Sequence, residues 1–147
     1  MITRPTLLLV TPKTFSFEKD IEGEFVKAGY DVIWINDRAS DSFLYKSLLR
    51  IFPNVVRFLS FIFYYKVVLS TLPEIQKALI IKGEGLSKDF YTTLKYNNPK
   101  LRISIYFWDS SSNLNNINLV RDVAEKIYTF DINDSVLYGF TYKPLFS

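Results

Sequence analysis

The sequence predicts one doubly wound α/β domain, in which helices cover both faces of a mostly parallel sheet of five or six strands. Short apolar runs alternate with longer amphipathic segments, which is the pattern of successive β-α-β units. The chain of 147 residues contains no internal repeat, low-complexity tract or linker. This length is typical of a single domain, so we expect residues 1–147 to form one.

The first β-α-β unit is the best marked. Thr6–Val10 is a compact apolar run that ends at Thr11-Pro12, and it predicts a buried strand. A helix follows, because apolar residues recur every four positions and acidic residues lie where the helix dipole favours them. Gly29 sits where a left-handed C-cap belongs, and Asp31–Ile35 is the second strand. The apolar positions of the helix are Phe17, Ile21 and Phe25.

The rest of the chain continues the alternation. Two helical pieces, Phe43–Phe52 and Asn54–Thr71, are separated by Pro53 and end before Pro73. Further helices are expected after Ser87, which is a favourable N-cap, and near Asp131. Another helix should carry Leu114, Ile117 and Val120. The remaining strands are expected at Lys77–Lys82, Leu101–Trp108, Ile127–Phe130 and Tyr142–Phe146.

The strand order that we favour is 2-1-3-4-5, the flavodoxin-like form of a Rossmann-like sheet. The third and fourth apolar runs look buried from end to end, which suits central positions better than the alternative order 3-2-1-4-5-6 does. In either order, the loops that leave the carboxyl ends of the strands line the ligand crevice. Candidate functional residues are therefore sought in those loops.

Composition excludes several classes of function. Cysteine and histidine are absent, which removes disulfides, Cys/His zinc sites and catalytic triads, and no metal motif is visible. The net charge is only +3 and is spread along the chain, so no nucleic-acid partner is expected. The apolar run Leu7–Val10 is too short for a signal peptide. We therefore expect a cytoplasmic protein.

Three loops at the carboxyl edge carry the candidate residues: the loops after the first, third and fourth strands. Lys82 and Lys13 offer cations, and Glu84 and Asp109 offer carboxylates. Ser110 and the residues after it offer hydroxyls and backbone N–H groups that suit an anion or a sugar hydroxyl. A structural alternative stays open for each of them. Lys82 and Glu84 can be solvated loop residues, and Asp109 and the serines can cap a helix. Gly83 and Gly85 can serve only the turn geometry.

Known phosphate-binding signatures are incomplete in this chain. Gly83 and Gly85 begin a G-x-G, but Lys88 stands where the dinucleotide fingerprint needs its third glycine, and no P-loop pattern occurs. Asp37 follows the second strand, where an acid can bind a ribose, and Arg38 follows it. A contact between Asp37 and Arg38 within the loop is the alternative.

The apolar segment Val55–Leu72 approaches the length of a membrane-spanning helix. Arg57 and Lys66 lie within it, and a central Arg or Lys costs roughly 2.5–3.5 kcal/mol on insertion scales, so it should not span. A buried helix is one expectation, and a helix that contacts a membrane surface or partner is the other. The second uses Phe58, Phe61, Ile62, Phe63, Tyr64 and Tyr65.

An ordered set of short motifs spans nearly the whole chain. It runs through Glu18-Lys19-Asp20-Ile21, Asp37-Arg38, Lys82-Gly83-Glu84, Tyr106-Phe107-Trp108-Asp109-Ser110, Phe130-Asp131, Tyr138-Gly139-Phe140 and Pro144-Leu145-Phe146. In order and spacing the chain resembles the amino-terminal domain of GT-B glycosyltransferase-like proteins of bacterial capsule and lipopolysaccharide biosynthesis.

The resemblance implies an acceptor-side domain that needs a second Rossmann-like domain, or a partner chain, for catalysis. It places Lys82, Glu84 and Asp109 at the interdomain cleft, with Asp109 or Glu84 as the base that activates an acceptor hydroxyl. The donor would be a nucleotide sugar, with no firmly bound cofactor. The acceptor would be lipid-linked, at the inner face of the membrane. A non-catalytic interaction module and a small-molecule-binding flavodoxin-like domain are the alternative functions.

Overall fold

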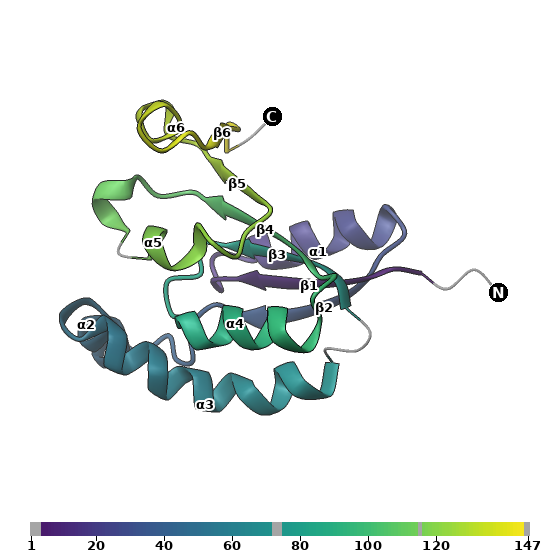
Figure 1. The fold of residues 1–147 in the computed structure, drawn as a ribbon, viewed down its shortest axis with the longest axis horizontal. Coiled ribbons are helices and arrows are strands. Elements are labelled where there is room, and N and C mark those ends of the chain that lie inside the picture. The colour runs from purple at the N-terminus through teal and green to yellow at the C-terminus, as the bar shows by residue number, and fades with distance from the viewer. Residues whose placement is uncertain (1–3, 72–74, 115, 146–147) are drawn as a thin grey trace.

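The strands form one parallel sheet in the order β2-β1-β3-β4-β5-β6 (Figure 1). The computed structural model describes residues 4–71, 75–114 and 116–145. The predicted fold and the order 2-1-3-4-5 are confirmed, with β6 added beside β5. The strands are β1 (Thr6–Thr11), β2 (Asp31–Asn36), β3 (Ile75–Ile81), β4 (Arg102–Phe107), β5 (Lys126–Thr129) and β6 (Thr141–Tyr142).

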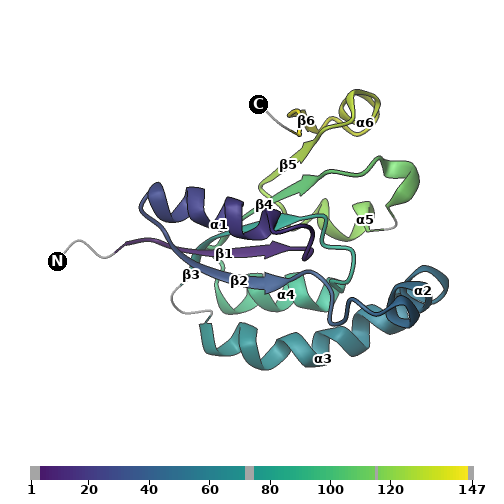
Figure 2. The ribbon, with the colours of Figure 1, turned by 180° about the vertical axis from the view of Figure 1, so that it is seen from behind.

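Helices cover the two faces of the sheet unequally. Helix α1 lies on one face, in front of the strands in Figure 2, whereas α3, α4 and α5 lie on the opposite face. Helix α2 extends past the carboxyl edge of the sheet (Figure 1). The helices are α1 (Phe17–Lys27), α2 (Phe43–Ile51), α3 (Pro53–Thr71), α4 (Lys88–Asn97), α5 (Ile117–Val120) and α6 (Ile132–Tyr138).

The core lies between the central strands and α4. Leu8 and Val10 of β1 belong to the same buried cluster as Phe90 and Leu94 of α4. In β4 the predicted alternation is confirmed, because Ile103, Ile105 and Phe107 are all buried. Burying a large apolar side chain of this kind contributes roughly 1.5–3 kcal/mol. The strands that carry the loops of interest are therefore fixed by this core.

Local signals at the helix ends are also confirmed. The Ser87 hydroxyl accepts a hydrogen bond from the backbone N–H of Phe90 at 3.2 Å, as expected of an N-cap. Gly29 follows α1 with a φ of 91°, the left-handed conformation that glycine adopts without strain. Pro53 begins α3 rather than only separating two helices, because proline is well tolerated in the first turn of a helix.

Two predicted elements are wrong in extent. The helix expected to carry Leu114 is a 3-10 turn at Ser111–Asn113 followed by the single-turn α5. The sixth strand covers Thr141–Tyr142 alone among residues 141–145, and the predicted end at Phe146 lies outside the described residues.

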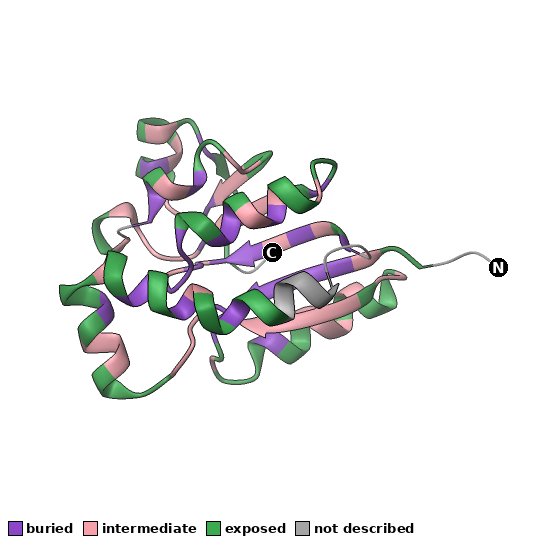
Figure 3. Cartoon of the chain, turned by 60° about the horizontal axis from the view of Figure 1, so that its bottom comes forward, coloured by how far each residue is buried: buried purple, intermediate pink, exposed green. Residues whose placement is uncertain are grey.

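Helix α3 is buried along one side and exposed along the other (Figure 3). Val56, Arg57, Ser60 and Tyr64 face the protein, whereas Phe63 is 65% exposed. The expected buried helix is therefore buried on one side only. Of the residues expected to contact a membrane or partner, Tyr64 is buried and Phe61 packs against the core, whereas Phe58, Ile62, Phe63 and Tyr65 are exposed. In the ranges that the structure describes, no helix combines the length and apolar character that crossing a bilayer requires.

Candidate functional site

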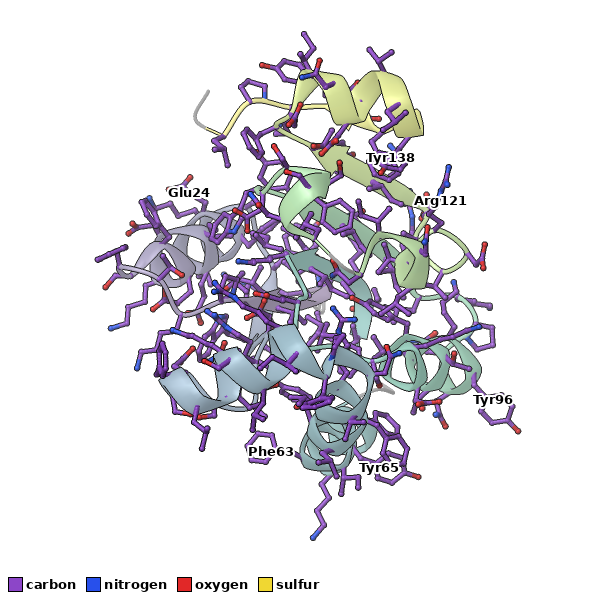
Figure 4. All side chains as sticks on the ribbon, turned by 90° about the vertical axis from the view of Figure 1, so that its left-hand side faces the viewer. Glu24, Phe63, Tyr65, Tyr96, Arg121 and Tyr138 are labelled. Atoms are coloured by element: carbon purple, nitrogen blue, oxygen red, sulfur yellow. The ribbon has the colours of Figure 1, made fainter. Side chains whose placement is uncertain are left out.

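Because the strands are parallel, their carboxyl ends bring the loops after β1, β2, β3 and β4 to one edge of the sheet. Figure 4 looks onto this edge, with α1 and α2 on either side of it. This is the edge at which doubly wound proteins bind ligands.

Lys82 is the centre of a charged cluster at this edge. Its ammonium lies 2.8 Å from a carboxylate oxygen of Asp109 and 3.3 Å from one of Glu84. Partial burial by itself lowers the pKa of Lys82. The hydrogen bond to Asp109 and the charges of Glu84 and Asp109 outweigh this effect, so the pKa lies above its ordinary value. The alternative of solvated loop residues is wrong for Lys82 and Glu84.

The backbone of Lys82 adopts a left-handed conformation, with a φ of 67°. This conformation costs a residue other than glycine roughly 1–2 kcal/mol. It persists because the loop is held from several sides. The side-chain amide of Asn116 donates to the carbonyls of Lys82 at 2.9 Å and Gly83 at 3.1 Å. Strain maintained in this way is typical of functional sites.

Arg57 holds the next residue of the same loop. It comes from α3, is 2% exposed, and donates from Nε to the Glu84 carbonyl at 2.8 Å. Burial lowers the pKa of its guanidinium, although Arg stays charged at neutral pH. The sequence showed Arg57 only as a charge in an apolar helix, and its role as a support for the β3–α4 loop needed the tertiary contact.

The two glycines of this loop serve its geometry, as one alternative proposed. Gly83 has a φ of 64°, and a Cβ there would lie 2.8 Å from the Tyr91 hydroxyl. A Cβ on Gly85 would lie 2.6 Å from the backbone oxygen of Asp37. Only glycine lets the β3–α4 and β2–α2 loops approach so closely.

Asp37 is a buried carboxylate behind the cleft. One oxygen accepts the Glu84 N–H at 3.3 Å, and the other lies 3.4 Å from Arg38 Nε. Burial raises the pKa of Asp37 to about 6, although the Arg38 charge and the Glu84 N–H oppose the increase. The predicted contact between Asp37 and Arg38 is confirmed, and Asp37 itself has no exposed surface for a ligand.

Two cavities meet at the charged cluster and share Arg38, Lys82 and Asp109 in their walls. The larger, of about 630 Å³, lies between α1 and the ends of β3 and β4; we call it the apolar cavity. Its apolar wall consists of Pro12, Phe17, Ile21, Ile81, Tyr106, Trp108 and Leu145, and Thr14, Asp20 and Glu24 also line it. The second, the basic cavity, measures about 540 Å³. Lys46, Leu49, Arg50, Glu84 and Asn113 complete its wall.

Besides Gly83 and Asp37, the predicted residues Lys13 and Ser110 do not line these two cavities. Lys13 is exposed and lines a separate cavity near Trp34. The Ser110 hydroxyl is hydrogen-bonded to the carboxylate of Asp131, and Ser111 donates from its backbone N–H to Asp134 at 2.6 Å. The serine loop thus binds carboxylates of the chain itself. Asp109 is paired with Lys82, and its predicted alternative as a helix cap is not seen.

Sequence reasoning missed Lys46 and Arg50. Both lie on α2 at a spacing of four, which places them on one helical face, beside the buried Leu49. The spacing was visible in the sequence, but nothing there showed that α2 would extend beside the β3–α4 loop. The described residues contain no group of three or more acidic side chains arranged to hold a metal ion.

The fold and the site define this chain as a Rossmann-like α/β domain with a charged cleft at the carboxyl edge of its sheet. No protein-family model matches the sequence, and no curated protein matches it. The expectation of a sugar-transfer role therefore depends on the sequence motifs and on the chemistry of the cleft.

Proposed function

We propose that this chain is the acceptor-side domain of a sugar-transfer enzyme, whose reaction centre is completed by a second domain or a partner chain. The observation that supports this most is the cluster of Lys82, Asp109 and Glu84 at the cleft. Trp108 and Tyr106 line the same cleft as Asp109 and Asp20. Aromatic rings beside carboxylates suit a sugar, because the rings pack on its C–H face and the carboxylates accept its hydroxyl protons.

The proposed step uses one of the two carboxylates as a general base. Asp109 or Glu84 takes the proton of an acceptor hydroxyl while the oxygen of that hydroxyl attacks the anomeric carbon of the donor. The bond from that carbon to the nucleoside diphosphate breaks, and the diphosphate leaves with the electron pair. Lys82 orients both carboxylates, because its ammonium contacts each of them.

The test is transfer by the protein supplied with its second domain or partner chain. We expect Asp109→Asn or Glu84→Gln to lower turnover by about 10²–10⁴-fold, the usual contribution of a general base. Asp122→Asn removes a carboxylate from an exposed position and serves as the matched control. Full turnover in both Asp109→Asn and Glu84→Gln would rule out this mechanism.

The exposed side of α2 and α3 favours placement at the inner face of a membrane. Exposed apolar side chains form a surface there, which we call the apolar helical face. The segment Phe43–Thr71 contains no acidic residue. A surface that is apolar and basic suits anionic lipid. In Figure 4, Phe63 of this face points away from the body of the protein. The face consists of Phe43, Leu44, Ile51, Phe52, Val55, Phe58, Leu59, Ile62 and Phe63.

Sedimentation with anionic and neutral liposomes tests this placement. We expect Ile62→Ser with Phe63→Ser to reduce binding to anionic liposomes, because both side chains are more than half exposed. Val136→Ser on α6 is the control, since Val136 is exposed but lies outside the face. No binding by the unchanged protein would remove the membrane from the proposal.

A non-catalytic interaction module is the second candidate. It is favoured by the pairing of Lys82 with both carboxylates, which leaves each of them already engaged. Under this function the apolar helical face would bind a partner protein. Transfer that is absent with every nucleotide sugar, together with a purified complex that Ile62→Ser with Phe63→Ser dissociates, would establish it.

A further inference from the structure

The basic cavity carries more positive than negative charge. Arg38, Lys46, Arg50 and Lys82 line it, against Glu84 and Asp109. Arg38 and Lys82 have carboxylate partners within 4 Å. For Lys46 and Arg50, the structure of residues 4–71, 75–114 and 116–145 gives no ion pair. The uncompensated charge of the cavity thus comes from α2.

This charge is unfavourable for the protein alone. Like charges four residues apart on a helix destabilise it by about 0.2–0.5 kcal/mol, and α2 has no acidic residue to offset them. Arg38 and Lys82 face the same cavity, but carboxylates pair with both of them. Because two of the four cations are already held by carboxylates, their positions are set before any ligand binds. An anion in the cavity would relieve the repulsion.

We propose that the basic cavity binds the phosphate group of a phosphate ester, whose remaining part occupies the adjoining apolar cavity. Arg50 can offer two parallel N–H donors to phosphate oxygens, Lys46 adds a point charge, and Arg38 adds positive charge from a position that Asp37 and Asp41 hold. Asn113 supplies a further amide at the wall. The shared residues Arg38, Lys82 and Asp109 mark where the ester bond would lie. The role of this ester as the acceptor of sugar transfer rests on the proposed function. The binding of phosphate in the basic cavity does not.

Isothermal titration with a hexose 1-phosphate tests the site, with the unphosphorylated hexose and inorganic phosphate as comparisons. We expect the hexose phosphate to bind more tightly than either comparison, because it fills both cavities. The double variant Lys46→Ala with Arg50→Ala should weaken its binding by at least about tenfold, since hydrogen bonds to charged groups are lost. Trp108→Ala should weaken the hexose phosphate but leave inorganic phosphate unchanged.

Arg4→Ala with Lys100→Ala is the matched control. It removes one Arg and one Lys from exposed positions at the opposite edge of the sheet, before β1 and β4. Equal binding by the unchanged protein and the variant Lys46→Ala with Arg50→Ala, or no phosphate binding at all, would overturn the inference. Circular dichroism of both double variants verifies that the fold is intact.

A second pair of titrations distinguishes the source of the phosphate. Vesicles of phosphatidylcholine with a minority of phosphatidic acid present the phosphate of a lipid, whereas hexose phosphate presents a soluble one. Binding of either ligand that depends on Lys46 and Arg50 supports the site. The ligand that binds in this way identifies the source of the phosphate. Phosphate binding that survives while transfer is absent contradicts the proposed function alone. Transfer that survives in the double variant with unchanged affinity contradicts only the phosphate site.

Discussion

The buried carboxylate of Asp37 makes a strong prediction about stability and pH. The group has no exposed surface and two long polar contacts, at 3.3 Å with the Glu84 N–H and at 3.4 Å with Arg38. Its pKa is raised from 3.8 to about 6 by burial. The folded protein therefore holds a proton on Asp37 at pH values where the unfolded chain has released it.

The sign follows from the number of protons bound in each state. Between pH 3.8 and about 6 the unfolded chain binds fewer protons at this site, so the free energy of unfolding falls as pH rises. The contribution of Asp37 is fully present below pH 3.8 and is lost as pH rises through about 6. The gap between the two pKa values corresponds to about 3 kcal/mol. Most of that is lost between about pH 4 and pH 7.

Asp37→Asn removes this titration while keeping the shape of the side chain. We expect the variant to gain stability relative to the unchanged protein by about 2–3 kcal/mol on going from pH 4 to pH 7. Urea denaturation of both proteins at several pH values measures the difference. In a chain of this size the same change moves Tm by roughly 2–4 °C per kcal/mol.

A direct titration accompanies the stability assay. The chemical shift of the Asp37 carboxyl carbon, followed by NMR, should report a titration with a midpoint near 6. Arg38→Met should move the midpoint higher, because the guanidinium charge favours the ionised carboxylate. A stability difference that stays constant from pH 4 to pH 7, with a midpoint near 4, would refute the reasoning.

Three further predictions concern the β3–α4 loop and its supports. Arg57→Met should lower the free energy of unfolding by about 2–3 kcal/mol, since a carbonyl loses its charged donor; Lys66→Met, exposed on the same helix, should change it little. Gly85→Ala should cost about 1–3 kcal/mol, because its Cβ would meet a backbone oxygen at 2.6 Å. Gly23→Ala, with open space around its Cβ inside α1, should instead gain about 0.5–1 kcal/mol. Asn116→Ala should cost about 1–3 kcal/mol, because two carbonyls lose their donor. Urea denaturation at neutral pH measures all five variants. Equal effects of Arg57→Met and Lys66→Met, equal effects of Gly85→Ala and Gly23→Ala, or unchanged stability of Asn116→Ala would contradict the assigned contacts.

Much of the fold was accessible from the sequence because its signals are local. The apolar runs fix the strands, the alternation from Leu101 to Phe107 fixes the buried side of β4, and Ser87 fixes the start of α4. Short elements were harder to predict. Around Leu114 the apolar spacing indicated a helix, but only a 3-10 turn and a four-residue helix form there.

The candidate site was predicted in part. Parallel strands place their carboxyl ends at one edge, so Lys82, Glu84 and Asp109 were expected together, and they are. Lys13 was also expected there, but it lines a separate cavity near Trp34. The direction of a loop side chain depends on its own backbone and neighbours, which strand order does not specify. The same reason explains why the serine loop binds Asp131 and Asp134.

The sequence by itself determined the class of fold, the strand order and the edge at which the chemistry gathers, because periodicity and chain connectivity are properties of neighbouring residues. Only the tertiary structure decided what each charge contacts. It placed Arg57 under the β3–α4 loop, buried Asp37 behind the cleft, and brought Lys46 and Arg50 of α2 to a cavity that Lys82 shares. These contacts join residues far apart in the chain. Their energies depend on burial and distance, which arise only when the helices pack on the sheet.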